Sequence, residues 1–435
     1  MSRITVIGAG LAGCEAAWYL AHQGIPVTLV EMKPIRYSPA HHSEGFAELV
    51  CSNSLKAERI ASAGGLLKAE MKRLGSLLVD CAYRCRVPAG GALAVDRDEF
   101  SRLVTREILN CLNITVEHRE VTQIPEGDVI IAAGPLASDA LSAEIQKLCG
   151  QELSFYDAAA PIVAAESLDR SRIFTQSRYD RGDADDYINC PMDREEYEAF
   201  YQELIHARTA QLHDFDHGGV YEGCMPIEVM AKRGADTMRF GPLKPVGLRD
   251  PATGKRPWAV LQLRKENAAG TLYNLVGFQT NLAFPEQKRV FGMIPALKNA
   301  QFVRYGVMHR NTFLNSPQVL NADFTLRAQP RIAFAGQITG VEGYMESACS
   351  GILAAYHMAR RVQGLPPVRF PNTTMCGSLS DYISASPTKN FQPMGANFGI
   401  IEPLEHQIRD KQQRYTALAE RSLETLDHIL QEGRA

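Results

Sequence analysis

The sequence predicts an α/β protein organised around a parallel β-sheet. The β-branched run Ile4–Val6 is followed at once by the glycine turn Gly8–Gly13, which reads Gly-Ala-Gly-Leu-Ala-Gly. Residues 14–22 then carry apolar side chains at helical spacing, and residues 25–30 form a second apolar run that ends in Glu31. A strand, a glycine turn, a helix and a second strand in this order are typical of a Rossmann-type unit that binds a dinucleotide.

Each part of the glycine turn has a physical role in such a unit. Gly8 permits the tight turn, Gly10 lets a pyrophosphate approach the backbone, and Gly13 lets the helix pack closely against the strand. The helix N-terminus, at Leu11 and Ala12, offers unpaired N–H groups and the positive end of its dipole to the phosphates. We therefore predict that these five residues bind the cofactor.

Glu31 stands where a carboxylate can accept both hydrogen bonds of a ribose diol. An acidic residue there disfavours the additional phosphate of NADP, so the pattern favours FAD or NAD. The alternative, a glycine-rich turn without a ligand, does not explain why the strand, helix and acid follow in the required order.

Two later stretches are predicted to return the chain to the same site. Asp128 precedes an apolar run over residues 129–133 that ends in Gly134, and residues 332–335 form another run that ends in Gly336-Gln337. Gly343-Tyr344 then opens a small-residue helix. A strand, a glycine loop and a helix suit the pyrophosphate and pyrimidine end of a flavin, so these residues join the predicted site and FAD is the expected cofactor.

Composition excludes several classes of protein. The net charge is −3, and the hydrophobic and charged fractions, 45% and 22%, are ordinary for a globular domain. No run approaches the about 18 apolar residues of a membrane helix, and the early glycine turn argues against a signal peptide. The ten cysteines form no C-x-x-C pair, so no metal site is predicted. A cytoplasmic protein with reduced thiols is expected.

The strand and helix alternation of the N-terminal part ends after residue 157. We predict an inserted α+β domain over residues 186–305, within a discontinuous, glutathione-reductase-like FAD-binding domain over residues 1–185 and 306–435. Asp96 and Glu99 form a capping pattern that predicts the start of a helix over residues 97–109.

One part of the predicted insertion is basic. Residues 225–290 contain 11 bases and 5 acids, a net charge of +6. An ordinary solvated face is the usual explanation, but the asymmetry also suits a phosphate-binding surface. The candidate RNA-binding residues are Lys232, Arg233, Lys255, Arg256 and Arg264.

Two cysteines stand in unusual surroundings. Cys51 lies between an apolar segment and a polar Ser-Asn-Ser turn, and Cys224 lies between Gly223 and Met225 at the start of the basic segment. Partial exposure and nearby polar groups are what a reactive thiol requires. The alternative is that both are small packed side chains.

Long motifs support a family resemblance over essentially the whole chain. The block from Gly336 to Tyr344, with the N-terminal glycine turn, resembles the glucose-inhibited-division family of FAD-dependent tRNA-modifying enzymes. The blocks Phe46–Lys56, Tyr221–Gly234 and Arg304–Asn311 narrow this to the folate- and FAD-dependent tRNA uracil-5-methyltransferase family.

The resemblance implies methylation of C5 of the uridine at tRNA position 54, in the T-loop. The carbon would come from 5,10-methylenetetrahydrofolate and the reducing equivalents from NAD(P)H through FAD. A thiolate must add to C6 before C5 becomes nucleophilic, and a second group must remove the C5 proton. We assign these roles to Cys224 and Cys51, with the reverse assignment open, and Tyr344 to orienting the folate ring.

Three alternatives remain at this stage. One is a glucose-inhibited-division type enzyme that adds an aminomethyl group to the wobble uridine with a GTPase partner. The second keeps the chemistry but acts on a ribosomal RNA uridine, and the third is a non-catalytic RNA-binding flavoprotein. We expect tRNA, tetrahydrofolate and NAD(P)H as partners, with no membrane and no obligatory protein partner.

Overall fold

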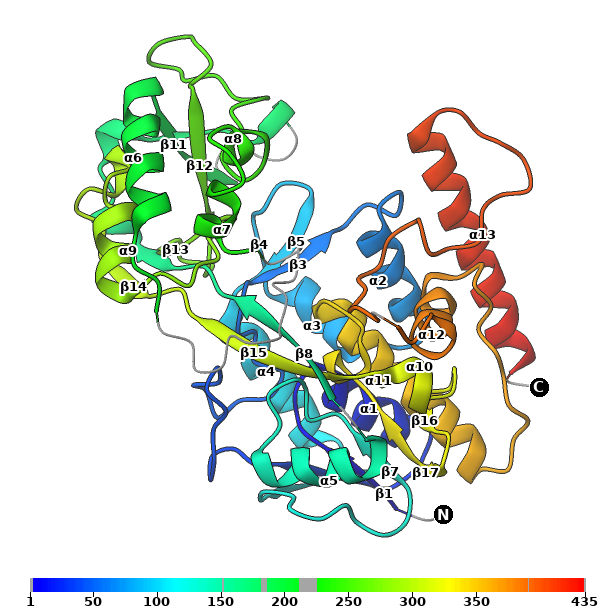
Figure 1. Ribbon diagram of the computed structural model, residues 1–435. Helices are drawn as coiled ribbons and strands as arrows, with labels where there is room; N and C mark the ends of the chain where they lie inside the picture. Colours follow the sequence, from blue (N-terminus) through cyan, green and yellow to red (C-terminus); the bar gives the residue numbers. More distant parts are fainter. Residues whose placement is uncertain (1–2, 151, 181–185, 211–224, 390, 434–435) are drawn as a thin grey trace.

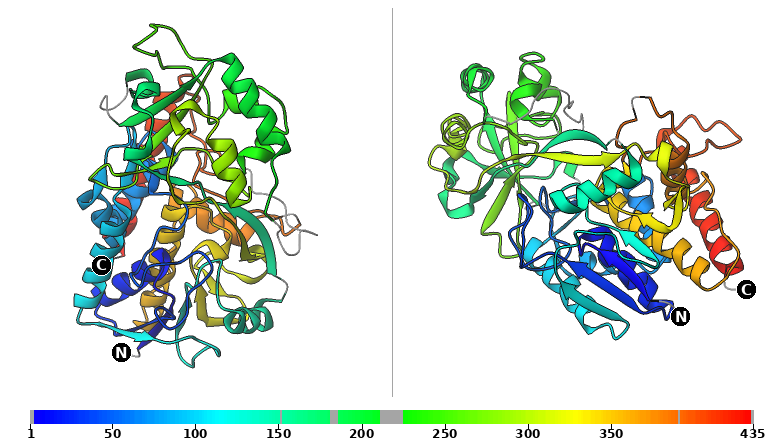
Figure 2. Two further views of the ribbon diagram at one scale, coloured as in Figure 1. Left: turned by 90° about the vertical axis from the view of Figure 1, so that its left-hand side faces the viewer. Right: turned by 60° about the horizontal axis from the view of Figure 1, so that its bottom comes forward.

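The computed structural model describes residues 3–150, 152–180, 186–210, 225–389 and 391–433. Two lobes are visible, and the two long strands β8 and β15 run between them (Figures 1 and 2). These strands pair in antiparallel register, with Met308 opposite Ala158 and Leu314 opposite Glu152. Their bounds are Glu152–Ala158 for β8 and Met308–Leu314 for β15.

The larger lobe is built on a six-stranded sheet with the order β16-β17-β7-β1-β2-β6. All neighbours pair in parallel except β16 and β17. The parallel core confirms the predicted Rossmann-type fold. Strand β1 lies between β2 and β7, so the glycine turn that follows β1 stands where the strand order reverses, which is where such sheets bind their ligands. The strands are β1 (Ile4–Ile7), β2 (Val27–Glu31), β6 (Ile114–His118), β7 (Val129–Ile131), β16 (Thr325–Leu326) and β17 (Gln329–Phe334).

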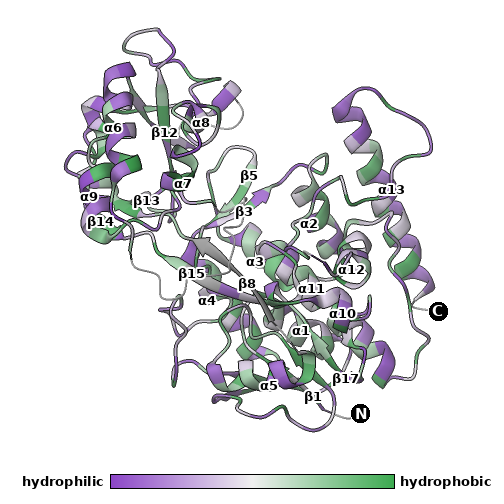
Figure 3. Cartoon of the chain, viewed as in Figure 1, coloured by the Kyte–Doolittle hydropathy of each residue, from purple (hydrophilic) through white to green (hydrophobic). Residues whose placement is uncertain are grey.

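Helices cover this sheet, and α1 and α11 pack against each other. Asp96 accepts a hydrogen bond from the Glu99 N–H (3.1 Å), so the predicted cap begins α4. Helix α13 carries both hydrophilic and hydrophobic residues (Figure 3), and it buries Leu418 and Leu426. The helices are α1 (Leu11–His22), α2 (Ala63–Arg73), α3 (Leu77–Arg84), α4 (Arg97–Asn110), α5 (Asp139–Cys149), α10 (Ser316–Val319), α11 (Tyr344–Val362), α12 (Met375–Ala385) and α13 (Lys411–Glu432).

A small antiparallel sheet with the order β3-β5-β4 lies beside these helices, on the side facing the second lobe (Figure 1). Its middle strand ends immediately before the cap of α4. None of the helices in the described part of the chain is long and apolar enough to span a membrane. The strands are β3 (Ser54–Ala57), β4 (Arg86–Val87) and β5 (Ala92–Val95).

The smaller lobe contains a second six-stranded sheet with the order β10-β11-β12-β13-β9-β14. Strands β9 and β10 lie before residue 186, so the boundary expected there falls within one sheet. We propose instead that the insertion runs from about residue 159 to about residue 307, between β8 and β15. The elements are β9 (Ile162–Ala164), β10 (Phe174–Thr175), β11 (Tyr187–Met192), β12 (Ala259–Lys265), β13 (Leu272–Leu275), β14 (Phe302–Arg304), α6 (Arg194–His206), α7 (Ile227–Ala231), α8 (Thr237–Phe240) and α9 (Phe284–Phe291).

A buried carboxylate joins α1 to the start of α3. Glu15 is fully buried and accepts hydrogen bonds from the N–H groups of Leu77 (3.0 Å) and Leu78 (3.1 Å) and from the Ser76 hydroxyl. These contacts satisfy N–H groups that a helix leaves unpaired at its N-terminus. Burial raises the pKa of Glu15 to about 7.

This pKa makes the stability of the larger lobe pH-dependent. Because the folded-state pKa lies above the unfolded value, the native state binds more protons, and stability falls as pH rises from about 4.5 to about 7. The free energy of unfolding of Glu15→Gln should not show this fall. Between pH 5 and pH 8, the difference in free energy of unfolding between the variant and the wild type should therefore shift in favour of the variant by roughly 1–3 kcal/mol. Denaturant titrations at several pH values test this, and a difference that is constant with pH would contradict it.

Candidate functional site

A cavity lies at the carboxyl ends of the parallel strands, where α/β sheets bind their ligands. Ten of the eleven predicted cofactor-binding residues line it, and Gly13 is the exception. Asn311 of β15 also lines it, as does Ala159, the residue that follows β8. The predicted residues in the lining are Gly8, Gly10, Leu11, Ala12, Glu31, Gly134, Gly336, Gln337, Gly343 and Tyr344.

The three glycines of the first turn have different surroundings. Gly8 has a φ of +97°, and a Cβ there would lie 2.7 Å from the Ala132 carbonyl oxygen. A Cβ on Gly13 would lie 1.8 Å from the Gly8 carbonyl oxygen, so Gly13 serves packing. A Cβ on Gly10 would meet nothing within 4 Å. Gly10 therefore presents its backbone to open space in the cavity, where a phosphate can approach.

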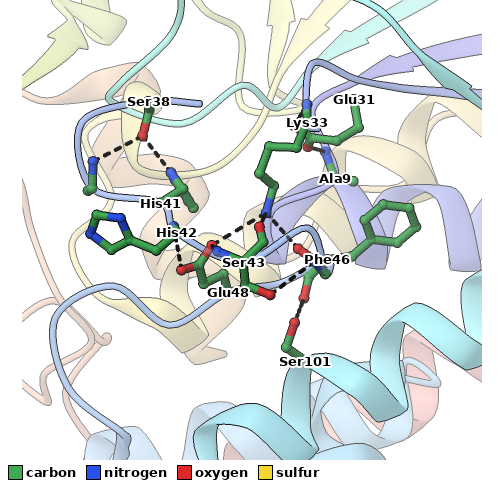
Figure 4. A network of polar contacts seen from close by, with 12 residues as sticks. Ala9, Glu31, Lys33, Ser38, His41, His42, Ser43, Phe46, Glu48 and Ser101 are labelled. Carbon is green, nitrogen blue, oxygen red and sulfur yellow. Dashed lines mark hydrogen bonds and ion pairs between the residues drawn. The ribbon is translucent and has the colours of Figure 1, made fainter. Parts of the chain in front are cut away.

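Two backbone N–H groups, one from the glycine turn and one from the residue two positions after Glu31, hold the Glu31 carboxylate in place. It is 7% exposed and accepts hydrogen bonds from the N–H groups of Ala9 (2.8 Å) and Lys33 (3.0 Å). Each carboxylate oxygen has a further lone pair, so Glu31 still has acceptor capacity for a ribose diol. The turn and the acid are thus one hydrogen-bonded unit (Figure 4).

A loop that the sequence analysis did not assign to the site closes one part of the cavity. The buried Lys33 ammonium donates to the carbonyl oxygens of Ser43 (3.0 Å) and Gly45 (2.6 Å) (Figure 4). Glu48 accepts from the N–H groups of His42 (2.9 Å) and Ser43 (3.2 Å). These contacts join residues distant from the glycine turn, and no local pattern predicts them. Ala40, His41 and Glu48 line the cavity.

Tyr344 connects the second glycine loop to the Cys51 segment. Gly343 has a φ of +117°, which lets the chain turn into α11 at Tyr344. The Tyr344 hydroxyl accepts hydrogen bonds from the N–H groups of Cys51 (2.7 Å) and Ser52 (3.1 Å). Burial raises the pKa of Tyr344, so its hydroxyl stays protonated at neutral pH.

Of the cysteines in the described part of the chain, Cys51 is the one that lines this cavity, and it is partly exposed. Burial raises the pKa of Cys81 and of Cys85 to about 12, and it also raises the pKa of Cys14. Buried thiols of this kind are unreactive. Cys51 therefore has the exposure and polar surroundings that the sequence predicted.

Cys224 lies outside the described residues, but the segment that follows it is placed. The Ile227 N–H donates to the Gln279 carbonyl oxygen (2.7 Å), and Gln279 lines the cavity.

The candidate RNA-binding residues separate into two groups. Lys232, Arg233, Lys255 and Arg256 are exposed on the smaller lobe. Arg264 is 7% exposed, and its guanidinium donates to Asn53 (2.9 Å) and Ser52 (2.7 Å). This position corrects the prediction for Arg264, because a side chain buried on β12 does not present its charge to a surface ligand.

Phe240 was missed by the sequence analysis. It is 85% exposed at the end of α8, between the candidate bases in the sequence. Its exposure is not predictable from the pattern, because a single phenylalanine in a mixed segment is more often buried than exposed. An exposed aromatic ring has the chemistry to stack on an unpaired base.

Comparison with known proteins identifies the family. A model of the family described as glucose inhibited division protein A matches residues 3–366. The methylenetetrahydrofolate–tRNA-(uracil-5-)-methyltransferase TrmFO of Acetivibrio thermocellus is 58% identical over 97% of each chain. Those of Bacillus licheniformis and Listeria monocytogenes are each 56% identical, over 98% and 99% of each chain. The chain belongs to the TrmFO family.

The two crystal forms of Aquifex aeolicus GidA, at 15% identity, show the fold alone, with TM-scores of 0.67 and 0.68. This chain is covered to 99% in both, and the GidA chain to 76% and 78%.

The residues that line the cavity fit FAD. Gly10 and the N-terminus of α1 face the cavity where the pyrophosphate would lie, and Glu31 would hold the adenosine ribose. Gly336 and Gly343 bring the N-terminus of α11 to the same cavity, so a second set of N–H groups faces the flavin end.

We expect Gly10→Val to abolish flavin binding without unfolding the protein. The new side chain would enter the open space of the cavity, where the pyrophosphate would lie, and its Cβ would meet no protein atom within 4 Å. Gly91→Val is the matched control, because a Cβ there also meets nothing within 4 Å but lies outside the cavity lining. Flavin absorbance and circular dichroism measure the two effects. Full flavin content in Gly10→Val would overturn the proposed site.

Proposed function

We propose that the chain methylates C5 of the uridine at position 54 in the T-loop of tRNA. 5,10-Methylenetetrahydrofolate donates the carbon, and NAD(P)H supplies reducing equivalents through FAD. The observation that carries the proposal is the place of Cys51, a partly exposed thiol in the wall of the cavity that fits FAD. Relatives at 54–58% identity over nearly the whole chain are named as methylenetetrahydrofolate–tRNA-(uracil-5-)-methyltransferases, and these names support the carbon donor, the RNA class and the methylated atom.

The reaction requires two groups from the protein. C5 of uracil becomes nucleophilic when a thiolate adds to C6, and a base must then remove the proton from C5. We assign the addition to Cys224 and the proton removal to Cys51. Bound FAD supplies the reducing equivalents that convert the transferred carbon to a methyl group.

Residues of this chain restrict the geometry of the second step. Tyr344 holds the backbone N–H groups of Cys51 and Ser52 through one hydroxyl, so the thiol projects from a fixed segment. Tyr344 also lines the cavity, where its ring would orient the folate. Positioning of a thiol and a ring on one wall reduces the conformational entropy lost in reaching the transition state.

The wobble-uridine alternative is not favoured. The identity to Aquifex aeolicus GidA is 15%, and this chain spans 76–78% of that protein, whereas the TrmFO relatives match over 97–99% of both chains. A ribosomal RNA target differs only in the nucleic acid, so mapping of methylated uridines in a deletion strain decides between the two RNAs.

We expect a covalent complex when 5-fluorouridine replaces the target uridine. Fluorine does not leave as a cation, so the protein stays bound after the thiol adds to C6. Cys224→Ala should lose both methylation and trapping while it retains flavin. Cys51→Ala should lose turnover but still trap RNA, because its work follows addition.

Denaturing gels and flavin absorbance read out the trapping experiment. Trapping by Cys224→Ala but not by Cys51→Ala would reverse the two roles. Methylation by the double variant would exclude both thiols. Cys149→Ala, which also replaces a partly exposed cysteine but lies outside the cavity lining, is the control and should leave both activities unchanged.

The exposed bases of the smaller lobe are proposed to bind tRNA phosphates. We expect Lys255→Glu with Arg256→Glu to weaken tRNA binding, because each base that is reversed no longer neutralises a phosphate. The salt slope of log Kd should fall by about 1 for each phosphate that the variant leaves without its cation. Flavin reduction by NAD(P)H should stay intact.

A control reverses one exposed base on the larger lobe. Lys411→Glu changes the charge at the start of α13 and should leave tRNA affinity near that of the wild type. Equal weakening by the control and the double variant would show that the affinity reflects overall charge and not this surface.

A further inference from the structure

The segment that carries Cys51 has no regular secondary structure. Residues 49–53 lie between the loop at Glu48 and the start of β3 at Ser54. Leu49 and Asn53 are buried, at 1% and 0% exposure. Buried backbone groups outside helices and sheets need other hydrogen-bond partners, so side chains from elsewhere must supply them.

Three arginines supply partners on both sides of Cys51. Arg304 donates to the Val50 carbonyl oxygen (2.6 Å), and Arg97 donates to the Leu49 carbonyl oxygen. Arg264 donates to the Ser52 hydroxyl (2.7 Å). Val50 and Ser52 are the immediate neighbours of Cys51, and Leu49 precedes Val50. Three guanidinium groups are therefore close to the segment that carries the thiol.

The arginines come from different parts of the fold. Arg97 begins α4 in the larger lobe, whereas Arg264 and Arg304 end or nearly end β12 and β14 in the smaller lobe. Asn53 joins the two lobes at the same place, because its side-chain amide donates to the carbonyl oxygens of Val95 (2.9 Å) and Lys265 (2.8 Å). The position of the thiol thus depends on both lobes.

The local charge is positive. Arg97 pairs with Glu266 (3.0 Å), and Glu266 is 4% exposed. Arg264 and Arg304 make no ion pair within 4.0 Å among the described residues. Tyr187 lies near Arg264 and Tyr344 lies near Arg304, and Glu266 interacts with both arginines from a greater distance. Guanidinium groups remain protonated in proteins. Three positive charges and one negative charge therefore surround the segment.

We propose that Arg97, Arg264 and Arg304 are positioning residues that hold the Cys51 segment and favour the thiolate form of Cys51. The charges of all three interact with Cys51. Nearby guanidinium groups stabilise a thiolate, and a thiolate is the form that accepts a proton. The inference rests on the proposed function in one respect: the thiolate form matters for catalysis because Cys51 is the proposed base.

Alkylation of Cys51 by iodoacetamide tests the inference without using RNA or folate. The rate at Cys51 is followed by mass spectrometry of its peptide from pH 5 to pH 10 in the flavin-loaded protein. We expect the midpoint of the wild type to lie about one pH unit or more below the value of about 8.5 for an ordinary thiol. A midpoint at or above that value, or no alkylation, would overturn the inference.

Variants of Arg304 separate charge from structure. Arg304 is only partly buried, so its replacement is less disruptive than that of Arg264. Arg304→Met should raise the midpoint by about one unit, and Arg304→Lys should raise it by less than half as much, because the charge remains. Arg97→Lys also retains the positive charge, so its alkylation midpoint should likewise rise by less than about half a unit.

Arg331→Met is the matched control. Arg331 also donates to two backbone carbonyl oxygens, those of Pro125 (2.9 Å) and Gly127 (2.8 Å), but it lies on β17 away from Cys51. Its midpoint should equal that of the wild type. If Arg304→Met lowers methylation but leaves the alkylation midpoint unchanged, the inference fails and the proposed function survives. If the midpoints shift but no variant or wild type methylates tRNA, the function fails and the inference survives.

Discussion

The close approach of α1 to α11 is the constraint on which the cavity depends. A Cβ on Gly351 would lie 2.1 Å from the Ala12 carbonyl oxygen, and one on Gly336 would lie 3.3 Å from the Ala12 Cβ. Because neither glycine has a side chain, the two helices meet at Ala12 and their N-termini face the same space. The first glycine turn and the loop before Tyr344 therefore form one cavity, although they are far apart in the sequence.

A second constraint acts where the lobes meet. The Cys51 segment is irregular, so its hydrogen bonds come from α4, α11, β12 and β14. Removing one partner of a buried hydrogen bond leaves the other unsatisfied, at about 1–3 kcal/mol for each such group. A small displacement of the smaller lobe would therefore move the hydrogen-bond donors of the Cys51 segment and change the position of the thiol.

The positive charges of the smaller lobe lie in two different environments. Lys255 and Arg256 are solvated, and the affinity that they provide for an RNA backbone would be sensitive to salt. Arg264 and Arg304 lie against the Cys51 segment, where screening by salt is weaker. Under the two proposals, exposed bases would contribute long-range attraction at the surface, and buried arginines would contribute local polarisation near the cavity.

The sequence by itself determined the glycine turn, the acid at the end of β2 and the cap at Asp96, because these depend on residues that are neighbours in the chain. It also predicted the parallel core, because a strand, a glycine turn, a helix and a second strand follow one another in the order of a Rossmann-type unit. It raised Cys51 as a candidate, but the role assigned to that thiol came from the family resemblance and stays a prediction. Tertiary structure decided the rest. It placed β9 and β10 in the second sheet, buried Arg264, and brought Tyr344 to Cys51 across 293 residues. A local pattern reports periodicity and turn chemistry, whereas contacts between distant side chains depend on how the two lobes pack.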